Sequence, residues 1–216
     1  MAERPVFLPA TTGTLLVEEV PIRFHWHPGL APSQKKKNVV ELHQAALARG
    51  FGPLLEISSK SELEVGQKLS AFHLKIKIGD KETTVECAYQ GSKVFERGGP
   101  YVDLYWKTSR EAKRDERLRE SGKLIGFNFE GESFPTSPAT VFYDWLYLKA
   151  LYPHRDWLKR RNEWAGFTDI EFNPEHSLNC QARSFAAFMA LQTRNQLDDA
   201  MASFQNFKAV MQSASI

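Results

Sequence analysis

The chain has 216 residues, of which 42% are hydrophobic and 25% are charged, and its net charge is +2. These values suit one globular domain spanning residues 1–216, and they exclude a strong overall field for nucleic acid or membranes. Two cysteines cannot form a disulfide scaffold, and neither a signal peptide nor a run of about 18 apolar residues is evident, so we expect a cytoplasmic protein with no membrane contact.

The first part of the chain predicts short strands followed by a helix. Residues 5–26 form extended pieces separated by turn residues. A helix is expected at 34–49, with Ser33 as its N-cap and Gly50 as its stop. A short strand is expected at 53–57. This order favours strands that pack under a helical layer.

The stretch TVECAYQGSKVFE, residues 84–96, follows the alternating sequence FHLKIKI, which predicts a half-buried strand at 70–78. The stretch itself predicts a helix. Its residues Glu86, Gln90 and Lys93 are spaced i, i+4 and i+7, so a helix would place them on one face. An acid, an amide and an amine in one line could serve acid/base chemistry if that face lines a cleft.

A solvated stripe is the ordinary alternative for these three side chains, and such pairs contribute only about 0.2–0.5 kcal/mol. Gly91 and Ser92 weaken that interpretation because both are poor choices for an exposed helix interior. Gly91 lies beside Gln90 and could admit a ligand or another backbone close to the helix.

The second half of the chain is more helical. The charged segment 107–123 predicts a solvated, salt-bridged helix, with a phosphate-backbone contact as the alternative. An aromatic-rich buried helix is expected at 139–151, and a short helix follows Pro153. Residues 184–211 predict one long amphipathic helix. We therefore expect an α+β fold, mainly helical, with a small antiparallel sheet.

Two further segments carry candidate binding residues. Lys35, Lys36 and Lys37 lie in the first turn of the predicted helix 34–49, where the helix dipole favours anions. The free N–H groups there and the lysines make a phosphate cradle plausible, and a solvated basic turn is the alternative.

The segment 164–183 mixes aromatic rings with carboxylates and amides, a composition that suits a purine or a ribose. The alternative is a loop whose polar side chains hold its own turns. The candidate binding residues here are Trp164, Asp169, Glu171 and Asn173.

No motif indicates a cofactor or a metal. The glycine-rich nucleotide motifs, the nucleophile elbow and zinc-type clusters are missing from the sequence. His25 and His27 would lie on one side of an extended segment, but no third ligand is evident nearby. We expect neither a cofactor nor a metal ion.

The stretch 84–96 resembles the signature of the NADAR family, in which a helix carries Glu, then Gln, then Lys. Three other stretches are similar to the branch encoded beside DarT-type ADP-ribosyltransferase toxins: APSQKKKN, SELEVGQKLSAFHL, and GFTDIEFNP followed by SLNCQAR. The resemblance implies a NADAR-like domain that hydrolyses N-glycosidic bonds to ribose. In this branch it implies an antitoxin that removes ADP-ribose from guanine in DNA, with ADP-ribosylated DNA or ADP-ribose as substrate and a DarT-type toxin encoded alongside.

The same resemblance implies roles for individual residues. Glu86 would steady the ribose cation or activate water, and Gln90 would orient the water or the ribose hydroxyls. Lys93 could hold a phosphate, help to expel the base, or attack the opened ribose as an amine. The lysines at 35 and 37 would meet the pyrophosphate, and Asp169 and Asn173 could contact the base or the ribose.

Two alternative functions stay open. One is a small-molecule N-glycosidase that acts on riboflavin intermediates, as some NADAR proteins do. The other is an antitoxin that neutralises its toxin by contact, without catalysis. A basic path leading to Glu86 would favour a nucleic-acid substrate, and either KKKN at 35–38 or segment 107–123 could supply it.

Overall fold

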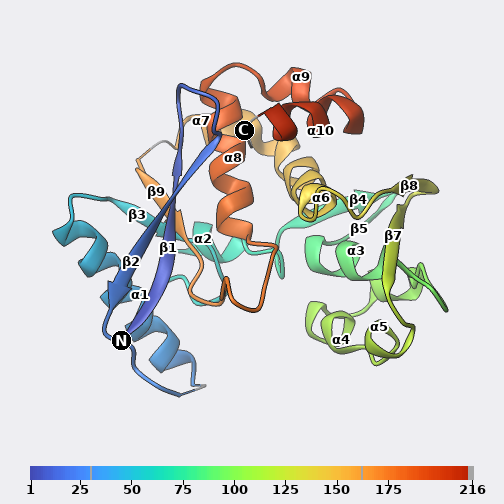
Figure 1. Ribbon diagram of the computed structural model, residues 1–216, viewed down its shortest axis with the longest axis horizontal. Helices are drawn as coiled ribbons and strands as arrows, with labels where there is room; N and C mark the ends of the chain where they lie inside the picture. The colour runs from blue at the N-terminus through green and yellow to red at the C-terminus, as the bar shows by residue number, and fades with distance from the viewer. Residues whose placement is uncertain (30, 162, 214–216) are drawn as a thin grey trace. The chain divides into compact units, whose positions relative to one another are not determined.

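The computed structural model describes residues 1–29, 31–161 and 163–213. These residues form two compact units (Figure 1). Unit 1 comprises residues 1–70 and the described residues from Tyr152 onward, and unit 2 comprises Ala71–Leu151. The expectation of one domain over 1–216 stays a prediction. The α+β class is confirmed, because both units combine helices with small sheets.

Unit 1 contains a four-stranded sheet in the order β2-β1-β9-β3. The strands are β1 (Ala2–Pro9), β2 (Val17–Phe24), β3 (Leu54–Glu56) and β9 (Gly166–Thr168). β1 and β2 pair antiparallel along their whole length, and β9 runs antiparallel to β1. β3 and β9 run parallel, so this sheet is mixed, and the expected small antiparallel sheet lies in unit 2.

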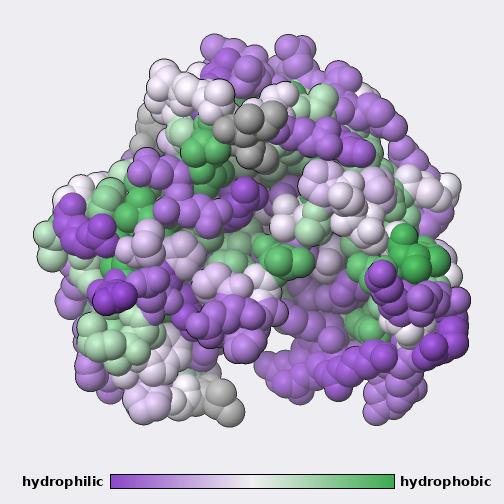
Figure 2. Space-filling model, in the orientation of Figure 1, coloured by the Kyte–Doolittle hydropathy of each residue, from purple (hydrophilic) through white to green (hydrophobic). Residues whose placement is uncertain are grey.

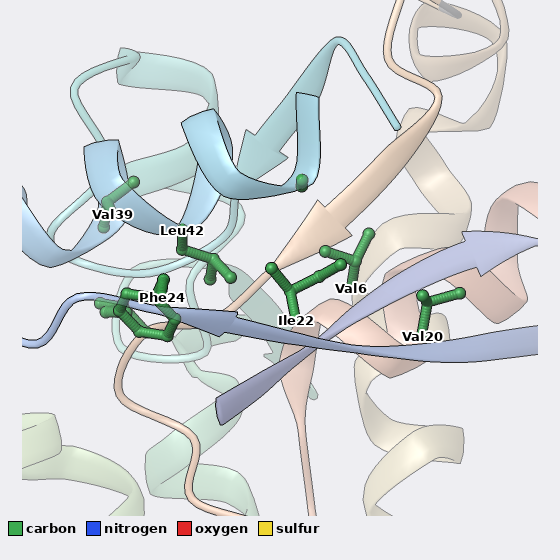
Figure 3. Close-up of a cluster of buried hydrophobic side chains, with 8 residues drawn as sticks. Val6, Val20, Ile22, Phe24, Val39 and Leu42 are labelled. Carbon is green, nitrogen blue, oxygen red and sulfur yellow. The ribbon is translucent and has the colours of Figure 1, made fainter. Parts of the chain in front are cut away.

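Helix α1 (Pro32–Ala48) covers the β1–β2 pair in unit 1. Its apolar side chains Val39 and Leu42 point toward those strands in Figure 3, where they meet Ile22 and Phe24. All four side chains are buried. The helix begins at Pro32 after an N-cap at Ala31, so the prediction of Ser33 as N-cap was wrong. Pro at the first helical position explains the earlier start, because its missing N–H needs no partner there.

The remaining helices of unit 1 are short except for α8. They are α2 (Glu64–Lys68), η2 (Tyr152–His154), α7 (Arg155–Lys159), α8 (Gln181–Thr193), α9 (Leu197–Met201) and α10 (Phe204–Ser213). The predicted single helix over 184–211 was therefore wrong. Asn195 adopts a left-handed φ of 55°, and the N–H of Gln196 donates to the Leu191 carbonyl. This is the usual helix stop, in which an Asn replaces the commoner Gly.

Unit 2 contains a hairpin, a three-stranded antiparallel sheet and several helices. The hairpin is β4 (Lys75–Ile78) with β5 (Lys81–Thr84), and the sheet is β6 (Lys93–Phe95), β7 (Leu124–Phe129) and β8 (Glu132–Phe134). The helices are α3 (Val85–Gly91), η1 (Val102–Trp106), α4 (Ser109–Arg114), α5 (Arg117–Glu120) and α6 (Val141–Leu151). The sheet packs against α6 through stacked aromatic rings: the centroid of Phe127 on β7 lies 4.3 Å from that of Phe142 on α6.

Three expectations for unit 2 need correction. The alternating strand begins at Lys75 and not at residue 70, because residues 71–73 form a turn. Segment 107–123 forms two short helices, since Asp115 is extended (ψ 128°) and interrupts the helical path. In addition, α3 ends at Gly91, so Lys93 lies on strand β6 and not on the helix face shared by Glu86 and Gln90. Within the described ranges, every helix is too short or too polar to cross a bilayer.

Candidate functional site

The β4–β5 hairpin and helix α3 together position Glu86. The hairpin ends at Thr84, whose hydroxyl caps α3 by accepting a hydrogen bond from the N–H of Cys87 at 3.2 Å. The N–H of Glu86 itself donates to the Ala71 carbonyl at 2.9 Å. Neighbouring apolar side chains bury the helix, and Glu86 is only 5% exposed. A carboxylate so deeply placed on a short helix is costly unless it is paired or serves a function.

Gln90 holds one oxygen of that carboxylate. Its Nε2 donates to Glu86 Oε1 at 2.9 Å, as the i, i+4 spacing predicted. No described residue contacts Glu86 Oε2 by a hydrogen bond or an ion pair. Gln90 Oε1 is also buried and lacks a hydrogen-bond partner among the described residues. A buried acceptor without a hydrogen bond destabilises the folded state by about 1–3 kcal/mol. Glu86 Oε2 and Gln90 Oε1 can therefore both accept a hydrogen bond from a donor such as water or a hydroxyl.

Lys93 provides an amine with an unusual pKa. Its Nζ lies 4.7 Å from the ring centroid of Tyr89, on the aromatic side of α3. Burial lowers the pKa of Lys93 to about 8; the charge of Glu86 opposes this shift, and the charge of Lys113 adds to it. Although Lys93 lies outside the helix, it therefore still interacts with Glu86. A pKa of about 8 leaves a useful fraction of the amine neutral near pH 7.

Sequence analysis missed Lys113 as a neighbour of this group. Lys113 comes from α4, its side chain is 58% exposed, and its Nζ lies 3.9 Å from Glu86 Oε1. The same Nζ lies 5.2 Å from the ring centroid of Phe72. The charged segment 107–123 was expected to be a solvated helix, and no local signal singled out this lysine.

Gly91 was expected to admit a ligand or another backbone, and the structure places a tyrosine ring and the backbone carbonyl of Tyr101 beside it. A Cβ on this residue would lie 2.5 Å from two ring atoms of Tyr105. The tyrosine ring therefore fills the space that a ligand was expected to use. Its hydroxyl lies 3.1 Å from the Ser92 hydroxyl, which fixes the end of α3 just before Lys93.

Unit 1 contains a second acidic group, formed by Asp169 and by Glu56, which sequence analysis had not singled out. Glu56 is buried, and it accepts hydrogen bonds from Ser58 Oγ at 2.6 Å, Thr168 Oγ1 at 2.6 Å and the Ile170 N–H at 2.9 Å. Burial raises the pKa of Glu56. Burial, and next the charge of Glu56, raises the pKa of Asp169 to about 8. Two buried acids this close cannot both ionise easily.

The lysines of α1 lie in unit 1 with Glu171. Lys35 Nζ lies 3.5 Å from Glu171 Oε1 and 5.3 Å from the Trp26 ring, whereas Lys36 and Lys37 are exposed. Pro32 has no N–H, and the N–H groups of Gln34 and Lys35 both donate to the Ala31 carbonyl. Any anion contact at this helix end would therefore depend mainly on lysine side chains.

The other predicted residues of unit 1 have ordinary local surroundings. Asn173 Oδ1 accepts a hydrogen bond from the Glu175 N–H at 3.3 Å, as a turn-holding asparagine does. Trp164 is partly buried. His27 Nε2 lies 3.0 Å from Glu41, and among the described residues no group of three His, Cys, Asp or Glu could hold a metal ion.

The chemistry that unit 2 can perform follows from its groups. A buried carboxylate with one oxygen held by an amide can stabilise a developing cation or direct a water molecule. An amine with a lowered pKa can act as a nucleophile or a proton carrier. This combination suits the cleavage of a bond at an electrophilic carbon, such as C1″ of a ribose.

The chain was compared with known proteins. No curated protein matches it. A family model described as "DarT1-associated NADAR antitoxin" matches residues 2–216, nearly the whole sequence. This match agrees with the resemblance carried by Glu86, Gln90 and Lys93, and the chain belongs to the family of DarT1-associated NADAR antitoxins.

Proposed function

We propose that this protein is an ADP-ribosyl glycohydrolase that removes ADP-ribose from guanine bases of DNA and so acts as the antitoxin of a DarT-type toxin. The observation that supports this function best is the buried Glu86 carboxylate, held by Gln90 and within electrostatic reach of Lys93. Membership of the antitoxin family supplies the biological setting.

In the proposed mechanism, Glu86 faces the C1″ carbon of the ribose. As the ribose ring opens, positive charge develops at C1″, and the carboxylate stabilises it. Oε1 stays in its hydrogen bond to Gln90, while Oε2 accepts the protons that the attacking amine gives up and passes them to the base nitrogen. Gln90 Oε1, which has no hydrogen-bond partner among the described residues, accepts a hydrogen bond from a ribose hydroxyl or from water.

Lys93 acts in this proposal as a neutral amine. Opening of the ribose ring leaves C1″ double-bonded to the base nitrogen, whose own proton passes to the freed ring oxygen. Nζ then adds to C1″, its two protons pass to the base nitrogen, and the base leaves as C1″ becomes double-bonded to Nζ. Water then hydrolyses the Lys93–ribose imine, which releases ADP-ribose and restores the amine. The lowered pKa supports this role over a phosphate contact, since a phosphate ligand benefits from a permanently charged lysine.

Reduction with borohydride tests the Lys93 step. An imine between Lys93 and ribose would be trapped as a stable adduct, and peptide mass mapping would place ADP-ribose on Lys93. Lys93→Arg is the control, because it keeps the charge but cannot form the imine. Full hydrolysis by Lys93→Arg, or no adduct on the active wild type, would contradict the amine role.

Lys36 and Lys37 are proposed to contribute to binding of the ADP-ribose pyrophosphate, since both are exposed near the start of α1. We expect the double variant Lys36→Glu and Lys37→Glu to weaken ADP-ribose binding in titration calorimetry. Unchanged affinity would remove the cradle. Roles for Asp169, Glu171, Asn173 and Trp164 in holding the ribose or base stay proposals of the same kind.

The two other functions are separated by one set of assays. The protein is incubated with an ADP-ribosylated guanine oligonucleotide and, separately, with a phosphorylated riboflavin intermediate. We expect release of ADP-ribose from the oligonucleotide and no cleavage of the riboflavin intermediate. A stable complex with the toxin, combined with protection by Glu86→Gln equal to that of the wild type, would instead favour neutralisation by contact.

A further inference from the structure

Three cations form an exposed strip on α4, which we name the α4 basic strip: Arg110, Lys113 and Arg114. Their i, i+3 and i+4 spacing places them on one side of the helix, and all three are exposed. Figure 2 shows hydrophilic side chains over the region where Figure 1 labels α4 and α5. The strip therefore presents concentrated positive charge on a protein whose net charge is only +2.

The inner side of α4 is fixed to the helix that carries Glu86. Ser109 Oγ donates to the Phe72 carbonyl at 3.0 Å and lies 2.8 Å from the Thr84 hydroxyl, which caps α3. Ala112 is buried against Cys87. A capping box between Thr108 and the carboxylate of Glu111 starts α4. These contacts hold the strip in a fixed position relative to the Glu86 carboxylate.

Two cations next to the strip are paired with acids, whereas two of the three cations in the strip are not paired with any described residue. Arg117 binds Asp103 at 2.7 Å and Asp115 at 2.8 Å, and Lys107 lies 3.3 Å from Asp115. In the part of the chain that the structure describes, Arg110 and Arg114 make no ion pair. Among the described residues, the only ion pair of Lys113 is the 3.9 Å contact with Glu86. The strip is therefore free to bind an anion from outside.

We propose that the α4 basic strip binds the phosphodiester backbone of single-stranded DNA and so presents a modified nucleotide to Glu86. The proposal rests on the proposed function. Lys113 connects the strip with the carboxylate, because its Nζ lies 3.9 Å from Glu86 Oε1, while Arg110 and Arg114 are exposed on the same helix. Single-stranded DNA is the expected form, because a carboxylate only 5% exposed cannot reach a nucleotide that is stacked in a duplex.

The test compares Arg110→Gln/Arg114→Gln with a matched control, Lys75→Gln/Lys77→Gln, which removes two exposed charges from β4. Neither pair belongs to the group around Glu86. Binding to an unmodified single-stranded oligonucleotide is measured at several salt concentrations. Each lost phosphate contact lowers the salt slope by about 0.7, so the α4 variant should lose about 1.4 in slope and bind about 25-fold more weakly at 0.1 M salt. The β4 control should match the wild type.

Hydrolysis separates DNA contacts from contacts with the ADP-ribose. The α4 variant should show a raised KM on an ADP-ribosylated oligonucleotide, with an unchanged rate on ADP-ribosylated guanosine. Equal losses on both substrates would overturn the proposal, because the strip would then serve the pyrophosphate. An unchanged salt slope would overturn it as well. If the wild type cleaves neither substrate, the proposed function fails, whereas the salt slope on unmodified DNA still tests the strip.

Discussion

The pKa of Lys93 predicts how the reaction rate changes with pH, and the direction of that change depends on whether this lysine reacts as a neutral amine or as a cation. Burial lowers that pKa to about 8. The neutral amine would then make up about 9% of the lysine at pH 7 and about 91% at pH 9. If Lys93 reacts as an amine, the rate of the chemical step should rise about tenfold between these pH values and then level off.

The assay is a single-turnover measurement with excess protein, in which the mass of an ADP-ribosylated oligonucleotide is followed from pH 6.5 to 9.5. Single-turnover conditions keep product release out of the observed rate. A lysine that works as a cation, through a phosphate or a leaving base, would instead lose activity as pH rises through 8. A flat or falling profile would refute the amine role, and Lys93→Arg should show no rise.

Three further predictions concern Glu86, Gly91 and Asp169. Glu86→Gln should keep the melting temperature and lose about 10²–10⁴-fold in hydrolysis rate, and normal hydrolysis by this variant would exclude Glu86 as the catalytic carboxylate. Gly91→Ala should lower the free energy of unfolding in urea by about 1–3 kcal/mol, because the added Cβ would lie 2.5 Å from the Tyr105 ring. An unchanged urea midpoint would show that the ring can move. The pKa of Asp169, raised by burial from 3.8 to about 8, means that the folded protein binds more protons than the unfolded chain between these values. Its contribution to stability is therefore present at pH 4 and is lost as pH rises through 8, so Asp169→Asn should flatten the fall in melting temperature between pH 5 and pH 8.

The sequence predicted those features that depend on local spacing. Glu86 and Gln90 are four residues apart, which predicted one shared helix face, and in the structure Gln90 Nε2 donates to Glu86 Oε1. The long helix α1 was expected within two residues of its observed ends. Lys93 was expected on the same helix, yet α3 ends at Gly91 and Lys93 pairs with Phe127 on β7, 34 positions along the chain.

Features that depend on distant partners could not be predicted. In the sequence, Glu56 is an ordinary residue of a predicted short strand. Its buried hydrogen bond comes from Thr168, which lies 112 positions away in the chain. Lys113 was hidden in a charged segment whose composition suits a solvated helix. Only the tertiary contact between α3 and α4 brings it to Glu86. The break at Asn195 had a local signal, since Asn adopts left-handed φ more readily than most residues, but the continuing apolar pattern outweighed it.

The central claim is that Glu86 and its neighbours hydrolyse the bond between ADP-ribose and guanine. The most direct measurement incubates a single-stranded oligonucleotide carrying ADP-ribose on guanine with the wild type and with Glu86→Gln, and follows its mass. The account predicts loss of one ADP-ribose with the wild type only. No loss with either protein, or equal loss with both, would contradict it.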